Sequence, residues 1–232
     1  MSASRSSAAG DCTVRNGSVI TAGGRARADL VIEDGVVTAI GAAAQRRGRE
    51  IDATGMLVLP GAVDIHTHID TAVSPDVRSA DDWYSGTVAA ACGGVTTVID
   101  YVRQEVGESL VAMMSRWEQR AAPRAVVDYG FHAVPMQFDD NVLTEIPALV
   151  AAGYPSVKIF MSRVPDDEMA MAMSVLASCE GTAMVHAEDQ ALKERAYDGR
   201  SHDDSPESKR NEGAPFRAED RIPSATHGSA VG

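Results

Sequence analysis

Residues 62–68 read Ala-Val-Asp-Ile-His-Thr-His, and this stretch decides how the fold is interpreted. Its apolar residues, with the run Leu-Val-Leu at 57–59 before it, are typical of a β-strand. Side chains alternate along a strand, so Asp64, His66 and His68 share one face. Two imidazoles on one face can bind one metal ion, and a pair of surface histidines on an edge strand is the alternative. The apolar flanks favour metal ligands.

Downstream of this stretch, short β-type runs alternate with helical stretches. We expect strands at 62–68, 95–100, 125–132, 156–161 and 182–186, and helices at 81–91, 109–121, 144–152, 166–178 and 188–197. Thr144 is the expected N-cap of the third helix, with Pro147 in its first turn. Repeated β–α units with apolar strands predict a parallel sheet covered by helices.

The number of β–α units bounds the architecture. A closed (β/α)₈ barrel needs eight units, and residues 61–198 supply five. The expected fold class is therefore α/β, with a partial TIM-type (β/α)₈ barrel over 61–198. A complete open sheet of five strands is the alternative that length allows.

The segment upstream of the barrel differs in character. Residues 11–60 contain short β-type runs and the turn dipeptides Asn16-Gly17, Gly23-Gly24 and Asp34-Gly35. We expect a small antiparallel, β-sandwich-like unit there. Residues 1–10 are predicted to be a disordered tail, and the polar residues 199–232 a loop or disordered tail.

Composition excludes several function classes. The 232 residues are 44% apolar and carry 21 Lys+Arg against 33 Asp+Glu, a net charge of −12. Nucleic-acid and anionic-membrane surfaces need clustered cations, so neither partner is expected. No apolar run approaches a membrane span, and the first ten residues lack a signal-peptide core. The three cysteines indicate no disulfide framework, so the predicted location is cytoplasmic.

Two further residues stand out because of where they lie. Lys158 occupies the middle of an apolar predicted strand, where a charge is costly unless it is paired or lost. It either extends its ammonium to the strand end or reacts with carbon dioxide to give an anionic carbamate ligand. His186 ends the fifth predicted strand. In a barrel, His66, His68, Lys158 and His186 would all point into the carboxyl-terminal mouth.

Taken together, these patterns resemble the cyclic amidohydrolases, and within them the hydantoinase/dihydropyrimidinase group. The matching stretches, in family order, are 52–55 (Asp-Ala-Thr-Gly), 60–61 (Pro-Gly), 64–68 (Asp-Ile-His-Thr-His), 93–97 (Gly-Gly-Val-Thr-Thr), 128–132 (Asp-Tyr-Gly-Phe-His), 156–161 (Ser-Val-Lys-Ile-Phe-Met) and 185–188 (Val-His-Ala-Glu). Dihydroorotases usually carry an arginine two residues after the second histidine, where this chain has Asp70. That difference argues against the dihydroorotase branch.

The resemblance implies a metal-dependent hydrolase that opens a hydantoin or dihydropyrimidine ring. It implies two divalent metals, usually zinc, bridged by a carboxylated Lys158, with His66 and His68 on the first metal and His186 on the second. It also implies a small cyclic amide as substrate and a homo-oligomeric assembly. Zinc accepts imidazole and oxygen ligands and lowers the pKa of bound water.

The chain departs from the family pattern at several positions. The family's strand-six histidine and strand-eight aspartate have no convincing counterpart, because His202 and His227 lie in polar surroundings without strand pattern. Arg163 stands where hydantoinases usually place an oxyanion-binding tyrosine. His132 ends a strand but has no ligand role in the family, and we expect it to be a packing or supporting residue. Only one complete metal position is therefore expected.

Two interpretations of function remain. The first is an enzyme, or part of one, that hydrolyses cyclic amide C–N bonds. The second is a catalytically incompetent truncated fragment or a non-enzymatic dihydropyrimidinase-related protein. Retention of His66, His68, Lys158 and His186 favours the first, and the absent strand-six and strand-eight ligands favour the second.

Overall fold

The computed structural model describes residues 10–41, 47–74, 76–105, 107–189 and 191. The chain divides into two compact units, Met1–Ala62 and Val63–Gly232. The expected tails and the helix predicted at 188–197 fall outside the described residues, except for Gly10, Glu188, Asp189 and Ala191. No helix of the described part is long and apolar enough to cross a membrane.

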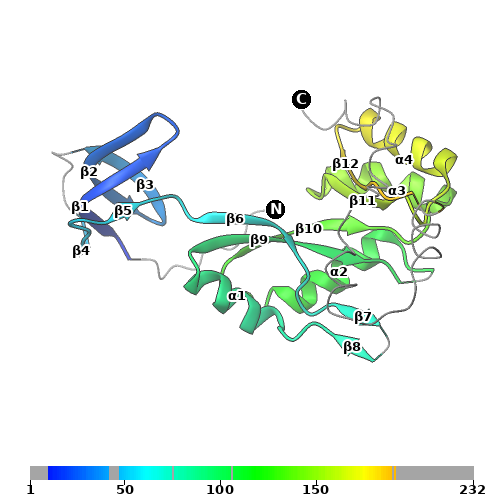
Figure 1. Ribbon diagram of the computed structural model, residues 1–232, viewed down its shortest axis with the longest axis horizontal. Coiled ribbons are helices and arrows are strands. Elements are labelled where there is room, and N and C mark those ends of the chain that lie inside the picture. The colour runs from blue at the N-terminus through cyan, green and yellow to red at the C-terminus, as the bar shows by residue number, and fades with distance from the viewer. Residues whose placement is uncertain (1–9, 42–46, 75, 106, 190, 192–232) are drawn as a thin grey trace, which may run out of the picture. The chain divides into compact units, whose positions relative to one another are not determined.

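The first unit is one five-stranded mixed sheet (Figure 1). Its strands are β1 (Cys12–Thr21), β2 (Gly24–Glu33), β3 (Val36–Gly41), β4 (Arg49–Asp52) and β5 (Leu57–Val58). The hairpins β1–β2 and β2–β3 are antiparallel, but β4 and β5 both run parallel to β1. The prediction of a purely antiparallel unit is therefore wrong. Turn dipeptides predict pairing only between strands that are adjacent in sequence. The parallel pairs β1–β4 and β1–β5 join strands that are not adjacent in sequence.

One of the three predicted turns is also wrong. Gly23-Gly24 and Asp34-Gly35 do close hairpins, but Asn16-Gly17 lies inside β1, where the pairing with β2 shifts register. Asn16 has a φ of 60°, as the irregularity requires. A Cβ on Gly17 would come within 2.5 Å of a methyl of Val58. The glycine is therefore needed for β5 to approach β1.

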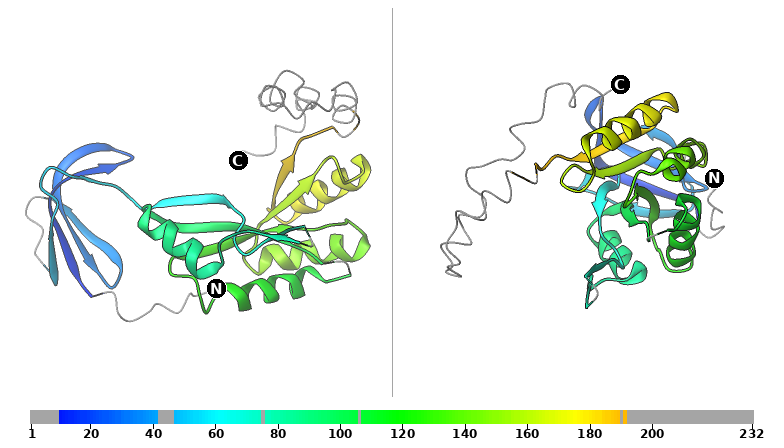
Figure 2. Two further views of the ribbon diagram at one scale, coloured as in Figure 1. Left: turned by 60° about the horizontal axis from the view of Figure 1, so that its bottom comes forward. Right: turned by 90° about the vertical axis from the view of Figure 1, so that its right-hand side faces the viewer.

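The second unit contains a five-stranded sheet in the order β12-β11-β10-β9-β6, with neighbouring strands parallel from β9 to β12. The strands are β6 (Ala62–Thr67), β9 (Val95–Arg103), β10 (Asp128–Val134), β11 (Ser156–Phe160) and β12 (Thr182–His186), and β7 (Ala72–Ser74) with β8 (Val77–Arg78) forms a separate hairpin. The sheet curls, and the helices α1 (Trp83–Cys92), α2 (Leu110–Ala121), α3 (Asp140–Ala151) and α4 (Asp166–Ser178) accompany it (Figures 1 and 2). The predicted partial barrel is confirmed.

The core lies between the sheet and its helices. The strands contribute Val98, Val102, Val157 and Ile159, each at most 1% exposed, to a cluster with α2's Met113. Burying a side chain of this size stabilises the fold by roughly 1.5–3 kcal/mol. Because side chains alternate, filling this layer sends the intervening residues of each strand to the opposite, inner face.

Helix α3 starts earlier than predicted. Asp139 is its N-cap and accepts a hydrogen bond from the amide of Val142 at 2.9 Å. Thr144 is not a cap; its hydroxyl donates to the carbonyl of Asp140 at 2.6 Å. Pro147 therefore lies inside the helix rather than in its first turn. The prediction overvalued the proline as a marker of the helix start.

Candidate metal centre

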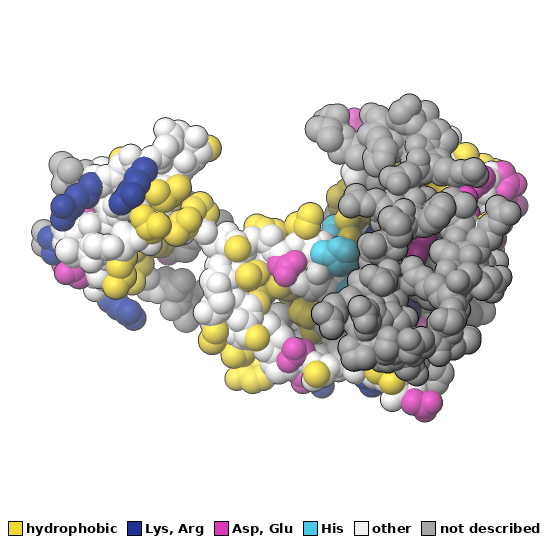
Figure 3. Space-filling view, in the orientation of Figure 1, with side chains coloured by type: hydrophobic (Ala, Val, Ile, Leu, Met, Phe, Trp, Pro, Cys, Tyr) yellow, Lys and Arg dark blue, Asp and Glu magenta, His cyan; other side chains and the backbone are white. Residues whose placement is uncertain are grey.

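The inner face of the curled sheet collects the residues that can carry chemistry. Strand alternation places Tyr101 and Arg103 of β9 on this face, because Val98, Asp100 and Val102 are buried on the other. By the same alternation it also receives Asp64, His66, His132, Ser156, Lys158, Phe160, Met184 and His186. Histidine side chains gather at one place on the second unit (Figure 3).

The ring of Tyr101 lies at the centre of one group. Its centroid is 4.5 Å from that of His66, 5.4 Å from that of His68 and 4.8 Å from that of His132. Its hydroxyl lies 3.8 Å from the sulfur of Met184, across the sheet. Tyr101 is only 4% exposed, and burial raises the pKa of its phenol. Tyr101 is therefore a neutral aromatic residue against which the two predicted ligands, His66 and His68, pack.

The His-x-His pair has the geometry of adjacent donors. The ring centroids of His66 and His68 are 5.3 Å apart, with the rings steeply inclined. Burial first, and then the charges of His66, Arg103 and Lys158, lower the pKa of His68. A lowered pKa keeps this imidazole neutral, which is the form that binds metals.

The end of β6 is held by a buried carboxyl. One oxygen of Asp100 accepts hydrogen bonds from the amide of Ile69 at 2.6 Å and the hydroxyl of Thr67 at 2.8 Å. These two residues flank His68, so their bonds fix its backbone. Burial raises the pKa of Asp100 to about 7, against the opposing effect of its two hydrogen bonds. Its other oxygen, Oδ1, is buried without a hydrogen-bond partner among the described residues.

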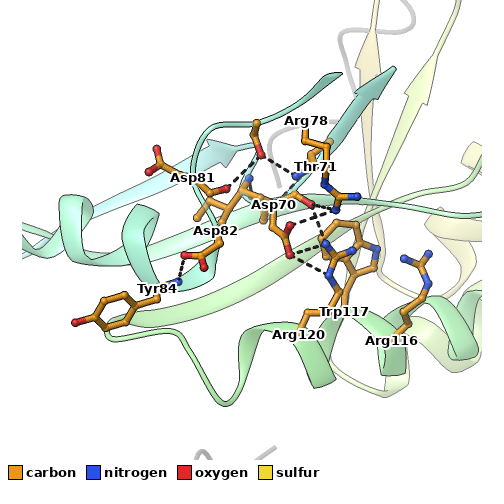
Figure 4. Close-up of polar contacts among 12 residues, drawn as sticks. Asp70, Thr71, Arg78, Asp81, Asp82, Tyr84, Arg116, Trp117 and Arg120 are labelled. Atoms are coloured by element: carbon orange, nitrogen blue, oxygen red, sulfur yellow. Dashed lines mark hydrogen bonds and ion pairs between the residues drawn. The ribbon is translucent and has the colours of Figure 1, made fainter. Parts of the chain in front are cut away.

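The turn after His68 is tied to helix α2 (Figure 4). Asp70 has a φ of 51°, and its carboxylate accepts a hydrogen bond from Nε of Arg120 at 3.0 Å. Arg78 adds a contact of 3.3 Å from β8, and the Arg120 guanidinium stacks on Trp117 at 4.5 Å. The carboxylate that separates this sequence from dihydroorotases therefore anchors the turn that carries His68.

His132 links three strands. Its Nε2 lies 3.0 Å from the carbonyl oxygen of Ile65, and its Nδ1 lies 2.5 Å from the hydroxyl of Ser156. The side chain is 7% exposed, and burial lowers its pKa. It joins β10 to the His-x-His strand on one side and to the lysine strand on the other.

Lys158 faces the same group from β11. Its ammonium nitrogen lies 5.4 Å from the ring centroid of Tyr101 and 5.5 Å from that of Phe160. Burial lowers the pKa of Lys158. The structure thus brings Lys158 together with His66 and His68 around Tyr101.

The other two predicted site residues gather around Phe160. The exposed ring of His186 lies 5.6 Å from the Phe160 ring, and its Nε2 is 3.7 Å from a carboxylate oxygen of Glu188. The guanidinium of Arg163, also exposed, lies 5.3 Å from the same ring. Lys158 is the residue shared by the two groups. His202 and His227 fall outside the described residues.

The donor set suits a metal ion only if the lysine takes part. Within the described ranges, no three His, Cys, Asp or Glu side chains are grouped so as to hold a metal. Two imidazole nitrogens and an anionic oxygen are, however, donors that zinc accepts, and a carbamate on Lys158 would provide the oxygen. The desolvated lysine beside two imidazoles fits that requirement, whereas the side chain of His186 contacts Phe160 and Glu188 within the described part of the chain.

Two residues of this face were missed in the sequence. The second predicted strand was ended at Asp100, whereas β9 continues to Arg103. Tyr101 and Val102 are strand-forming residues, and extending the alternation by three positions would have placed Tyr101 and Arg103 on the inner face.

Comparisons with known proteins agree with this arrangement. The amidohydrolase family matches residues 57–217. The chain is 39% identical to the D-hydantoinase of Ralstonia pickettii over 184 residues, and 40% identical to the D-phenylhydantoinase of Escherichia coli over 186. Each alignment covers 77% of this chain and 40% of the relative, so the chain spans about two-fifths of the relatives' length.

Solved structures give the same result. A D-hydantoinase structure superposes with a TM-score of 0.77 at 38% identity, covering 81% of this chain and 42% of the other. The family match over residues 57–217 includes His66, His68 and Lys158 and the strands of the curled parallel sheet. By sequence and by fold, the chain belongs to the amidohydrolase family.

Proposed function

We propose that this chain carries the metal-binding half of a hydrolase that opens cyclic amides of the hydantoin or dihydropyrimidine type. The observation that carries the proposal is the meeting of Lys158 with His66 and His68 around Tyr101, on the inner face of a barrel sheet. Similarity to proteins named D-hydantoinase and D-phenylhydantoinase supports the choice of substrate class.

The proposed metal is zinc, held by His66, His68 and the carbamate of Lys158. His186 and the same carbamate would form the less complete second position, so one tightly held ion per chain is expected rather than the two that the resemblance implies. A bound zinc ion would supply Lewis-acid activation of water and of the ring carbonyl.

The chain's own residues prepare this site. Tyr101 and Phe160 desolvate Lys158, which favours the neutral amine. The lone pair of that amine forms an N–C bond with carbon dioxide and the nitrogen loses a proton, leaving an anionic carbamate. Asp100, Asp70 and His132 hold the strand end and the turn that carry the imidazoles. Arg163, with five N–H donors, is the proposed donor to negative charge developing on the carbonyl oxygen.

The proposal also covers the cellular location and the assembly of the protein. The three cysteines are free, which suits the cytoplasm. A homo-oligomer is proposed from the family alone. The competing proposal is a chain that binds metal without turnover, and it is favoured by the incomplete surroundings of His186.

The test measures zinc content and carbamate together. Wild-type protein supplied with ¹³C-bicarbonate should show a carbamate carbon signal and hold about one zinc ion. Lys158→Ala should lose both. Tyr129→Phe is the matched control, because it removes a 2.8 Å hydrogen bond to Glu118 on the helix-facing side of β10. A wild-type chain with neither carbamate nor zinc would refute the proposed site.

Ring opening separates the enzyme from the metal-binding chain. We expect dihydrouracil turnover by the isolated chain to stay well below about 1 s⁻¹, because a positioned acid–base group contributes about 10²–10⁴-fold and the family's strand-eight aspartate has no convincing counterpart in this sequence. Faster turnover that disappears in Lys158→Ala would show that the isolated chain is a working enzyme.

A further inference from the structure

Arg103 occupies a fixed place at the carboxyl end of β9. It is the last residue of the strand and pairs with Val134 of β10. Its carbonyl oxygen accepts hydrogen bonds from Arg116 at 3.0 Å and from the indole of Trp117 at 3.4 Å. Its backbone is therefore anchored to α2, and strand alternation directs its side chain to the inner face that holds Tyr101.

The guanidinium of Arg103 has no carboxylate partner in the part of the chain that the structure describes. Arg116 and Arg120, on the neighbouring helix α2, do have one: Arg116 lies 2.7 Å from Glu108, and Arg120 pairs with Asp70. The chain has 33 Asp and Glu residues, so carboxylates are not scarce. Arg103 is partly buried, and a partly desolvated cation is costly unless an anion compensates it.

Arg103 lies two residues beyond Tyr101 on the same face of β9, and the Tyr101 ring contacts both His66 and His68. Arg163 supplies a second guanidinium at the end of β11, also without a carboxylate partner among the described residues. Because Arg163 is the proposed donor to the oxyanion, Arg103 is available for a different role.

We propose that Arg103 binds an anionic substituent of the substrate, so that the preferred ring is a cyclic amide carrying a carboxylate. This inference rests on the proposed function and narrows its substrate class. A guanidinium binds a carboxylate with two parallel hydrogen bonds, which fixes orientation as well as affinity. An anion bound beside His68 would place the attached ring next to the His66–His68 pair.

The experiment compares two probes that differ in the anionic group alone. The dissociation constants of hydantoin-5-acetate and hydantoin are measured with zinc-supplied chain by titration calorimetry. For wild type, we expect the carboxylated ring to bind at least about 10-fold more tightly, an advantage that shrinks as salt is raised. Arg103→Gln should reduce the advantage to less than about 2-fold. Arg103→Lys should keep part of this advantage, because lysine retains the positive charge but cannot form the two parallel hydrogen bonds of a guanidinium.

Arg25→Gln is the control, since Arg25 is an exposed arginine of the first unit that contacts only Ser18 among the described residues. It should behave as wild type. Equal affinities for the two probes, no binding of either, or an advantage that survives Arg103→Gln would each overturn the proposal. Loss of the ¹³C-carbamate signal in Arg103→Gln would also overturn it, because Arg103 would then hold the carbamate. Zinc and carbamate in wild type report on the proposed function separately.

Discussion

The two groups of residues on the inner face differ in how firmly they are held. Around Tyr101, the His66–His68 strand and its turn are fixed by hydrogen bonds that the carboxylates of Asp100 and Asp70 accept, and by the contact of His132 with the Ile65 carbonyl. Around Phe160, the exposed His186 side chain contacts one aromatic ring and lies 3.7 Å from one carboxylate oxygen of the described residues. We therefore expect the proposed zinc position at His66 and His68 to bind more tightly than the one at His186.

The sharpest test of this difference removes one histidine from each group. Zinc-finger affinities of about 10–16 kcal/mol over four ligands correspond to roughly 2.5–4 kcal/mol per ligand, or about 10²–10³-fold in zinc affinity. His68→Ala should therefore weaken zinc binding by about that factor, whereas His186→Ala should change it by less than about 3-fold. Competition with a chromophoric zinc chelator measures both. Equal losses would mean that the two groups form one site.

The next effect concerns Asp100 and pH. Because burial raises the pKa of Asp100 from 3.8 to about 7, the folded state binds more protons than the unfolded state between these values. The free energy of unfolding should therefore fall as pH rises from about 4 to about 7, by roughly 3 kcal/mol from this group, and level off above. Urea unfolding of apo-protein at a series of pH values measures it.

Asp100→Asn keeps the size and an acceptor oxygen for Thr67 and Ile69, so it should flatten this pH dependence. Asp128→Asn removes an exposed carboxyl at the start of the neighbouring strand and is the control. An Asp100→Asn profile parallel to that of wild type would show that Asp100 does not hold the proton in this window.

The smallest predicted effect concerns His132. His132→Leu removes both of its partly buried hydrogen bonds and leaves the carbonyl oxygen of Ile65 and the hydroxyl of Ser156 to find other partners. We expect about 1–3 kcal/mol of lost stability and a roughly 10-fold weaker zinc affinity. His132→Gln, which can still reach one partner, should recover part of both. The control variant Tyr129→Phe should lose stability but keep its zinc affinity. If Tyr129→Phe lost as much zinc affinity as His132→Leu, His132 would have only a packing role.

The fold was accessible from the sequence because apolar alternation and helix periodicity are local properties. The five barrel strands and the helices α1, α2 and α4 follow from them directly. The errors arise where a local signal has more than one structural use. Asn16-Gly17 can turn a hairpin or form an irregularity within a strand, and only the packing of Val58 against Gly17 decides between them.

The candidate site was accessible only in part. Strand ends predict that His66, His68 and Lys158 share a face, because side-chain direction is fixed by alternation. The separation of His186 from them depends on sheet curl and on the side chain of Phe160, which no local pattern encodes. Tyr101 was missed because the end of β9 was placed three residues too early. The start of α3 was predicted wrongly for a similar reason, because Asp139 and Thr144 are both acceptable N-cap residues.

The aromatic ring of Tyr101 also makes the site observable. Protons near the face or edge of such a ring have their nuclear magnetic resonance frequencies displaced by its circulating electrons, and three imidazoles lie with centroids 4.5–5.4 Å away. The carbon-bound protons of His66, His68 and His132 should therefore resonate apart from those of exposed histidines. Any movement of the His-x-His strand relative to Tyr101 would change these frequencies. The histidine proton spectrum of the apo-protein therefore reports whether these side chains keep their places around the ring.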